Sequence, residues 1–261
     1  MKRQLENLIF SMYLKKHEND ELRRFGSEYG GWHICLCKKH LSIESIVVSG
    51  GVGEDISFDV ELLRFAEKIS IKLVDPTPKA ISHYESYKST SDNLDPTPYS
   101  TNGRQEPSGY FSTASTRSRI SLIRKAISVD TKGVFLFPPK NSQHSSYSST
   151  SIGDSDNKVE FQSSSLFEIF GDINKENGSK LANLIILKLD IEGSEFAVLM
   201  QNKFTNPKPS QIAVEIDFMR ELNRGYLAKL SNLVLLLKKM KDSGYRLANK
   251  EKSNLLFLAE M

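Results

Sequence analysis

The chain has 261 residues, of which 39% are apolar and 26% are charged, and its formal net charge at pH 7 is +3. This length and composition are typical of one large globular domain with a substantial core. So small a net charge gives no support to nucleic-acid or membrane-surface binding, and no apolar run is long enough to form a transmembrane segment.

The first 40 residues are expected to form a helix and a connection that pack on the core. Apolar side chains recur at Leu5, Leu8, Ile9, Met12 and Tyr13, which is the spacing of an amphipathic helix docked on a domain. Polar residues interrupt any signal-type apolar region, and no small-residue cleavage site follows. With two cysteines and no export signal, we expect a cytoplasmic location.

The connection after this helix, YGGWHICLCKKHLS, is expected to be a turn and a short extended or helical segment. It holds four potential zinc ligands: His33, Cys35, Cys37 and His40. Structural zinc usually needs a second ligand pair further along the chain, and this sequence has none. We therefore expect no metal site here.

From residue 41 to 261, apolar strands alternate with helices. Strands are expected at 43–51, 70–74, 184–190 and 211–217, helices at 56–68, 192–202 and 226–244, and two strands around a polar turn at 245–260. This pattern predicts an α/β fold with a mainly parallel sheet, an antiparallel terminal strand pair and helices on both faces. Ligands of such sheets bind beyond the carboxyl ends of the strands, where the strand order reverses.

Two long segments, 87–119 and 141–165, interrupt this alternation. Both are rich in Ser and lack sustained periodicity, which favours mobile loops. The alternative is that one of them covers the ligand site, because long loops in compact domains are often functional.

A glycine-rich turn, VVSGGVGEDISF, follows the strand at 43–51. Gly51 and Gly53 would let the backbone approach a ligand closely, as in the dinucleotide-binding fingerprint. Ile56 stands where that fingerprint has Gly or Ala, which disfavours tight packing over a pyrophosphate. The turn therefore suits a nucleoside ligand without a pyrophosphate, with a glycine turn that binds nothing as an equal alternative.

Asp75 follows the next strand at the position from which an acid can accept hydrogen bonds from ribose hydroxyls. The alternative is that it caps local turn amides, because Asp-Pro often starts a turn. The same tetrapeptide, Asp-Pro-Thr-Pro, recurs at Asp95 without an apolar strand before it. For Asp95 we therefore predict only a role in a turn.

Further carboxylates gather at the ends of two later strands. Asp190 and Glu192 follow one strand, and Glu215 and Asp217 end the next. Packing does not explain four acids at adjacent strand ends, because buried carboxylates are costly without partners. For Glu192 alone, the alternative is that it caps the following helix.

Six segments in this order resemble the FkbM-type methyltransferases, which use S-adenosylmethionine (SAM). They are GGW at 30–32, SGGVGEDISFDVEL at 49–62, VDPTP at 74–78, FPPKNSQHSSYS at 137–148, LKLDIEG at 187–193 and VEID at 214–217. The resemblance covers the chain from residue 30 to its C-terminus and implies a Rossmann-like class I methyltransferase fold with SAM as the cofactor.

The resemblance also implies roles for particular residues. The implied cofactor-binding residues are Ser49, Gly50, Gly51, Gly53, Asp55, Asp75, Pro76 and Asp190. The implied catalytic residues are Asp190, His144 and Glu192, with Asp190 and His144 as alternatives for the base that takes a hydroxyl proton. Ser49 and Gly50 stand where many members carry an acid, and Asp55 either substitutes for that acid or caps the following helix.

The expected function is therefore O-methylation of a small-molecule or carbohydrate acceptor, without nucleic acid. No metal-binding residue is assigned, and a divalent metal assisting at Asp190 and Glu192 is a minor alternative that stays open. Two other readings stay open: an NAD-dependent oxidoreductase on a similar sheet, which Ile56 disfavours, and a SAM-binding module without turnover. The sequence leaves the acceptor and the oligomeric state undetermined.

Overall fold

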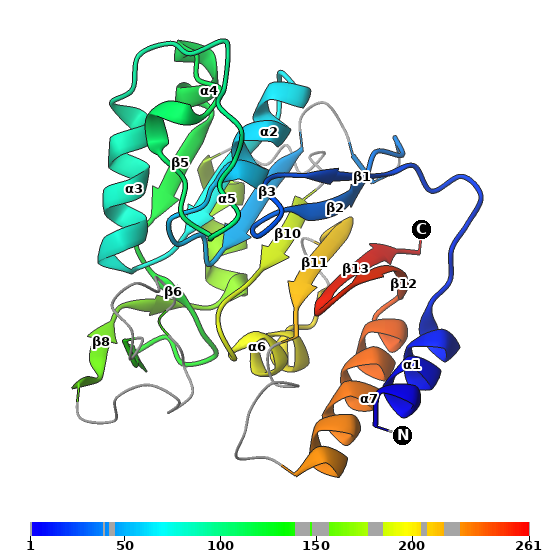
Figure 1. The fold of residues 1–261 in the computed structure, drawn as a ribbon. Helices are drawn as coiled ribbons and strands as arrows, with labels where there is room; N and C mark the ends of the chain where they lie inside the picture. Colours follow the sequence, from blue (N-terminus) through cyan, green and yellow to red (C-terminus); the bar gives the residue numbers. More distant parts are fainter. Residues whose placement is uncertain are drawn as a thin grey trace.

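The protein is described by a computed structural model at residues 2–38, 40–41, 45–138, 147, 157–176, 185–204, 208–216 and 225–260. Its centre is a seven-stranded mixed sheet with the strand order β12-β13-β11-β10-β3-β4-β5 (Figure 1). The strands of this sheet are β3 (Ile46–Gly50), β4 (Ser70–Val74), β5 (Ile120–Ile123), β10 (Ile185–Leu189), β11 (Gln211–Glu215), β12 (Tyr245–Glu251) and β13 (Asn254–Ala259). The prediction of an α/β chain with a mixed sheet is confirmed.

Strands β5, β4, β3, β10 and β11 are parallel, and β13 lies antiparallel between β11 and β12. The strand order reverses at β3, because the chain first runs outward through β4 and β5 and then returns on the other side of β3 as β10. A reversal of this kind opens a crevice beyond the carboxyl ends of the strands.

The register brings the strand ends level with one another. Gly50 at the end of β3 lies opposite both Val74 of β4 and Leu189 of β10, and Leu189 lies opposite Val214 of β11. The residues that follow these ends therefore meet at one rim of the sheet. That rim carries the glycine loop, Asp75, Asp190 and Glu215.

Helices cover both faces of the sheet, because successive strand side chains point to opposite sides. Val48 packs in one cluster and Val47 in the other. The first cluster includes side chains of α1 (Lys2–Tyr13), α5 (Leu166–Glu176), α6 (Glu195–Gln201) and α7 (Tyr226–Asp242). The second includes side chains of α2 (Ser57–Phe65), α3 (Pro78–Lys88) and the hairpin β1 (Leu22–Phe25) to β2 (Trp32–Cys35).

The expected N-terminal helix is present as α1, and its docking face is partly the expected one, since Ile9 and Tyr13 pack against the core. Phe10 is buried, whereas Leu5, Leu8 and Met12 are 41%, 59% and 71% exposed. The helix is turned so that Phe10, rather than these three residues, reaches the core beside α7 and β12.

The β1–β2 hairpin is the second contribution of the N-terminal 40 residues. Its backbone at Cys35 is bonded to Gln211 of β11, which accepts from the Cys35 N–H at 2.7 Å and donates to the Cys35 carbonyl at 2.8 Å. Cys35 and Cys37 form a disulfide. Asp20, whose carboxylate lies near both sulfur atoms, is paired with the buried Arg246. The first 40 residues thus contact both faces of the sheet.

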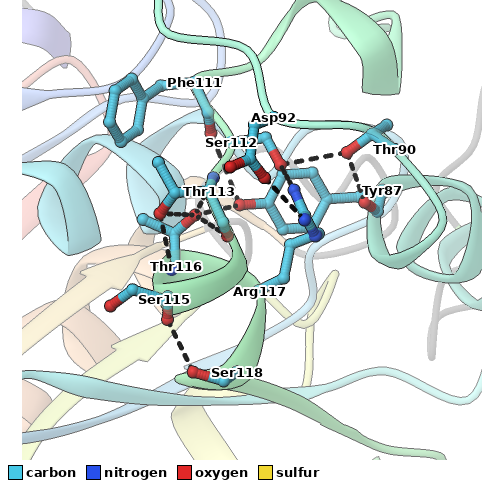
Figure 2. A network of polar contacts seen from close by, with 10 residues as sticks. All are labelled: Tyr87, Thr90, Asp92, Phe111, Ser112, Thr113, Ser115, Thr116, Arg117 and Ser118. Carbon is cyan, nitrogen blue, oxygen red and sulfur yellow. Dashed lines mark hydrogen bonds and ion pairs between the residues drawn. The ribbon is translucent and has the colours of Figure 1, made fainter.

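The segment between α3 and β5 is held by many polar contacts (Figure 2). It contains η1 (Pro107–Gly109) and α4 (Ala114–Ser118). The Tyr87 hydroxyl donates to Thr116 Oγ1 at 3.3 Å, and the Arg117 guanidinium donates to Ser112 Oγ at 2.6 Å and to Asp92 Oδ1 at 2.8 Å. Part of the 87–119 segment expected as a loop therefore has defined structure, with η1 against α3 and α4 against β5.

Of the second long segment, 141–165, residue 147 and residues 157–165 are described. They include strand β8 (Val159–Phe161), which pairs antiparallel with β7 (Val134–Leu136), and β9 (Ser163–Ser164), which pairs parallel with β6 (Ala126–Ile127). Within the described ranges, no helix has the length and hydropathy needed to cross a membrane.

Candidate active site

A cavity of about 280 Å³ lies at the rim where the sheet order reverses. Its floor and walls come from residues 51–55, 74–77 and 190–192, together with Lys188 and Glu215. The turns of two hairpins complete it, at 28–32 between β1 and β2 and at 251–254 between β12 and β13. The side chains of Ala126, Ile127, Val134, Leu136 and Tyr147 add a largely apolar wall.

The glycine loop is locked between β4 and β10. Gly51 has a φ of +69°, and a Cβ atom at this position would lie 1.7 Å from the carbonyl oxygen of Asp190. Its N–H donates to the Val74 carbonyl at 3.0 Å, while the Asp190 N–H donates to the Gly50 carbonyl at 3.0 Å. Both the conformation and the close approach therefore require glycine at position 51.

Asp75 is buried and its carboxylate holds the glycine loop. Oδ2 accepts from the Val52 N–H at 2.9 Å and the Gly53 N–H at 3.1 Å, and Oδ1 accepts from the Thr77 N–H at 2.9 Å and the Thr77 hydroxyl at 2.7 Å. The turn interpretation therefore describes part of what Asp75 does, since it also joins β4 to the loop. Asp75 and Pro76 line the cavity.

Asp95, in the second copy of the tetrapeptide, has different surroundings. It is exposed, and its N–H donates to Asn93 Oδ1 at 3.1 Å within a local turn. It does not line the cavity. The two copies of the tetrapeptide thus differ in position as the sequence predicts.

Asp55 connects three segments around the cavity. Oδ1 accepts from the Ser57 N–H at 2.9 Å at the start of α2, and Oδ2 accepts from the Ser27 hydroxyl at 2.7 Å and the Gln105 amide at 3.1 Å. Asp55 precedes Ile56, the N-cap of α2, so it bonds the first amide of the helix without being its N-cap. The same carboxylate also ties the β1–β2 turn and the 89–119 segment to the glycine loop.

Asp190 and Lys188 lie at the end of β10. Asp190 lines the cavity, and its Oδ2 is 3.9 Å from the Lys188 ammonium. Lys188 is 5% exposed, donates to the carbonyl oxygen atoms of Gly50 (3.2 Å) and Gly51, and lies over the Trp32 ring. Sequence reasoning missed Lys188, although a lysine inside an apolar strand was a visible signal for it.

Two glutamates, Glu192 and Glu195, lie at the turn into α6, where an active-site role and a helix-capping role were alternatives for Glu192. Glu192 lines the cavity with a φ of +52°, a conformation that non-glycine residues rarely adopt. Glu195 is buried and accepts from the Ile191 N–H at 2.7 Å and the Gly193 N–H at 3.0 Å, ahead of α6. Glu195 therefore binds the backbone amides before this helix.

Not every expected site residue reaches the cavity. Gly51, Gly53, Asp55, Asp75, Pro76, Asp190 and Glu192 line it, whereas Ser49 is buried and, with Gly50, lies outside the lining. His144 and Asp217 lie outside the described residues. Glu215 lines the cavity and accepts from the Ser253 hydroxyl at 2.6 Å.

The cavity is acidic. Its lining contains eight carboxylate residues, Glu28, Glu54, Asp55, Asp75, Asp190, Glu192, Glu215 and Glu251, against three basic ones, Arg24, Lys188 and Lys252. Such a lining favours a ligand that carries positive charge. Among the residues that the structure describes, these acids form no group close enough to share a metal ion.

One further acid lies on the core side of this rim. Asp59 of α2 is 2% exposed, and burial raises the pKa of its carboxyl to about 7 against the opposing charge of Lys188. The charge of Lys188 therefore acts on the core as well as on the cavity.

A family model described as the methyltransferase FkbM domain matches residues 56–247, about three quarters of the chain. A comparison with curated proteins returns no match.

Among the solved structures to which this chain is similar, two align with 84% of its length. The first is TnmH, with 12% identity and a TM-score of 0.34, and the second is CalO1, a methyltransferase in calicheamicin biosynthesis in its SAH-bound form, with 10% identity and a TM-score of 0.33. The aligned part covers 51% and 50% of those chains, so this chain matches about half the length of each. Both TM-scores are too low to carry an argument about activity.

Proposed function

The chain belongs to the FkbM methyltransferase family, and we propose that it binds SAM and transfers the methyl group to a hydroxyl oxygen of a sugar, polysaccharide or natural product. The supporting observation is the cavity at the strand-order reversal, where the glycine loop, Asp75 and Asp190 meet. The proposed fold is accordingly the Rossmann-like class I methyltransferase fold. We assign it to residues 41–261, with residues 1–40 adding the β1–β2 turn to the cavity.

The residues of the rim fit a nucleoside ligand that carries a positive charge. The glycine loop brings its backbone to the cavity surface, and Asp75 and Pro76 lie beside it. We assign the ribose to Asp75 and the rest of the donor to the loop at 51–55. The excess of carboxylates in the lining supports a cationic donor, because opposite charges attract across a low-dielectric cavity.

SAM would supply a methyl group on a sulfonium cation, so the protein has to align an acceptor oxygen and remove its proton. A base within hydrogen-bond reach of the acceptor is needed for that step. Asp190 is the candidate at the strand end, on the cavity surface. His144 is the alternative, and Glu192 lies on the same rim as a further polar contact for the acceptor.

The acceptor would enter beside the two hairpin turns. This side of the cavity combines Trp32 with the polar groups of residues 251–254, and Tyr147 on the apolar wall adds a second aromatic ring to the lining. Aromatic faces beside hydroxyl-binding polar groups suit a carbohydrate or polyketide-like acceptor.

Calorimetric titration with SAM, S-adenosylhomocysteine and NAD tests the proposal. We expect saturable binding of both sulfur ligands and none of NAD. Transfer of a labelled methyl group from SAM to a panel of sugars and hydroxylated natural products then tests turnover. NAD binding without a response to either sulfur ligand would refute the proposal, and SAM binding without turnover on any acceptor would favour an inert binding module.

A further inference from the structure

Lys188 places a buried ammonium group within the sheet. The residue is 5% exposed in β10, between Leu187 and Leu189, which are both fully buried. An ammonium group in such surroundings is costly unless charges and hydrogen bonds compensate it, and an apolar side chain of similar size would often be as stable. Its presence therefore calls for a role beyond packing.

The partners of Lys188 lie in the proposed donor site, apart from the buried Asp59 of α2, on which its charge also acts. Its ammonium donates to the carbonyl oxygen atoms of Gly50 and Gly51, and it lies 3.9 Å from Asp190 Oδ2. The Trp32 ring, another cavity residue, is 5.4 Å away.

Asp75 and Lys188 contact the glycine loop through opposite kinds of group. Asp75 accepts from the N–H groups of Val52 and Gly53, whereas Lys188 donates to the carbonyl oxygen atoms of Gly50 and Gly51. Four successive residues of the loop are therefore held by two buried charges of opposite sign. A loop fixed in this way loses less conformational freedom when a ligand binds.

We propose that Lys188 is a positioning residue of the donor site, which fixes the glycine loop through its carbonyl oxygen atoms and favours the ionised form of the Asp190 carboxylate. The inference rests on the proposed function, since it assumes that the loop binds SAM and that Asp190 acts as the base.

A matched control lies on the adjacent part of the sheet. Lys72 of β4 is also a strand lysine, but its ammonium reaches Glu176 at 2.7 Å and does not line the cavity. K72M therefore removes a strand lysine without touching the loop. K188M removes the charge and the donor of Lys188 at nearly constant volume, and K188R retains the charge.

The first measurement is hydrogen exchange of the backbone amides of residues 51–53 in the ligand-free protein. We expect exchange to be at least tenfold faster in K188M and unchanged in K72M. The second is the calorimetric Kd for SAM, which we expect to rise at least tenfold in K188M, less in K188R, and not in K72M.

The third measurement is the pH profile of kcat/KM. Loss of a cation beside Asp190 disfavours the ionised form of the Asp190 carboxylate. The fall of kcat/KM at low pH, the acid limb of the profile, should therefore shift to higher pH in K188M and stay in place in K188R. A purely structural lysine would not move this limb. If K188M does not fold, K188L, which also lacks both the charge and the donor, takes its place under the same criteria.

Unchanged loop exchange together with unchanged SAM affinity in K188M would overturn the proposal, and so would equal shifts of the acid limb in K188M and K188R. Failure of the wild-type protein to bind SAM would instead refute the proposed function. The exchange measurement needs no ligand, and it would still decide whether Lys188 fixes the loop.

Discussion

The carboxylate of Asp75 accepts a hydrogen bond from the backbone N–H of Gly53 at 3.1 Å, which joins the end of β4 to the loop that follows β3. The same oxygen atom accepts from Val52, and the other accepts twice from Thr77. Asp75 thus shapes the loop before any ligand arrives. Its proposed contact with ribose and its structural role act on the same part of the cavity.

Substitution of Asp75 should therefore affect both stability and donor binding. Asp75→Ala removes an acceptor from four donors, which we expect to cost about 2–4 kcal/mol of unfolding free energy, and it should weaken SAM binding by at least about tenfold. Asp95→Ala is the control, because Asp95 is followed by the same three residues, Pro-Thr-Pro, but is exposed away from the cavity. Urea denaturation and calorimetry measure the two effects, and equal SAM affinity in both variants would refute the ribose assignment.

The close approach of Gly51 to Asp190 gives a second prediction. Gly51→Ala would place a methyl group 1.7 Å from the Asp190 carbonyl oxygen, so the loop has to move. We expect a loss of about 2–4 kcal/mol in unfolding free energy and at least about tenfold weaker SAM binding.

Gly171 provides the control for this substitution. It lies inside α5, and a Cβ atom added there meets nothing within 4 Å. Gly171→Ala should raise the unfolding free energy by about 0.5–1 kcal/mol, because alanine favours the helix. The same urea denaturation compares both variants, and a Gly51→Ala protein as stable as Gly171→Ala would contradict the observed loop geometry.

The strands around the site could be predicted from local sequence, because each is a short apolar run that ends in Gly, Asp or Glu. The ends of these apolar runs also predicted that Asp75, Asp190 and Glu215 lie on one rim, since the ends of parallel strands meet at the same edge of a sheet. The short strand β5, in a polar stretch, had no such signal. Its register opposite β4 is a tertiary property.

What the sequence did not predict depends on contacts between distant segments. The β1–β2 turn reaches the cavity because Gln211 binds the backbone of Cys35, 176 positions earlier. Lys188 and Glu195 gain their roles from backbone groups of the loops around them. Neither residue type nor spacing indicates such partners, whereas the three-dimensional arrangement does.

The identity of the base gives a third prediction. Asp190→Asn keeps the shape of the side chain but removes its basicity, so turnover should fall by at least about 100-fold in a protein that still binds SAM. His144→Ala tests the alternative base in the same way. A methyl-transfer assay run beside calorimetry separates turnover from binding. Near-normal turnover in both variants, with SAM still bound, would refute both assignments.

A fourth prediction concerns the pH dependence of stability. Burial raises the pKa of Asp59 to about 7, against the attraction of Lys188. In the unfolded chain the carboxyl has its ordinary pKa near 3.8. Between these two values the folded protein holds a proton that the unfolded chain has released, so stability falls as the pH rises, by at most about 1.4 kcal/mol per pH unit.

Asp59→Asn isolates this effect, because an amide does not titrate. Asp20 acts in the opposite direction: burial works to raise its pKa, but hydrogen bonds, chiefly from Arg246, lower it overall, so its contribution is lost as the pH falls. The difference between the variant and the wild type cancels Asp20 and the other shared groups. Unfolding free energies at pH 4, 5.5, 7 and 8 can be followed by the fluorescence of Trp32, the single tryptophan of the chain. We expect the variant to gain stability relative to the wild type from pH 4 to 7 and then to level off, because above the pKa of Asp59 in the folded protein both states have lost the proton.

A constant difference across this range would show that Asp59 keeps an ordinary pKa in the fold, and that Lys188 compensates its burial fully.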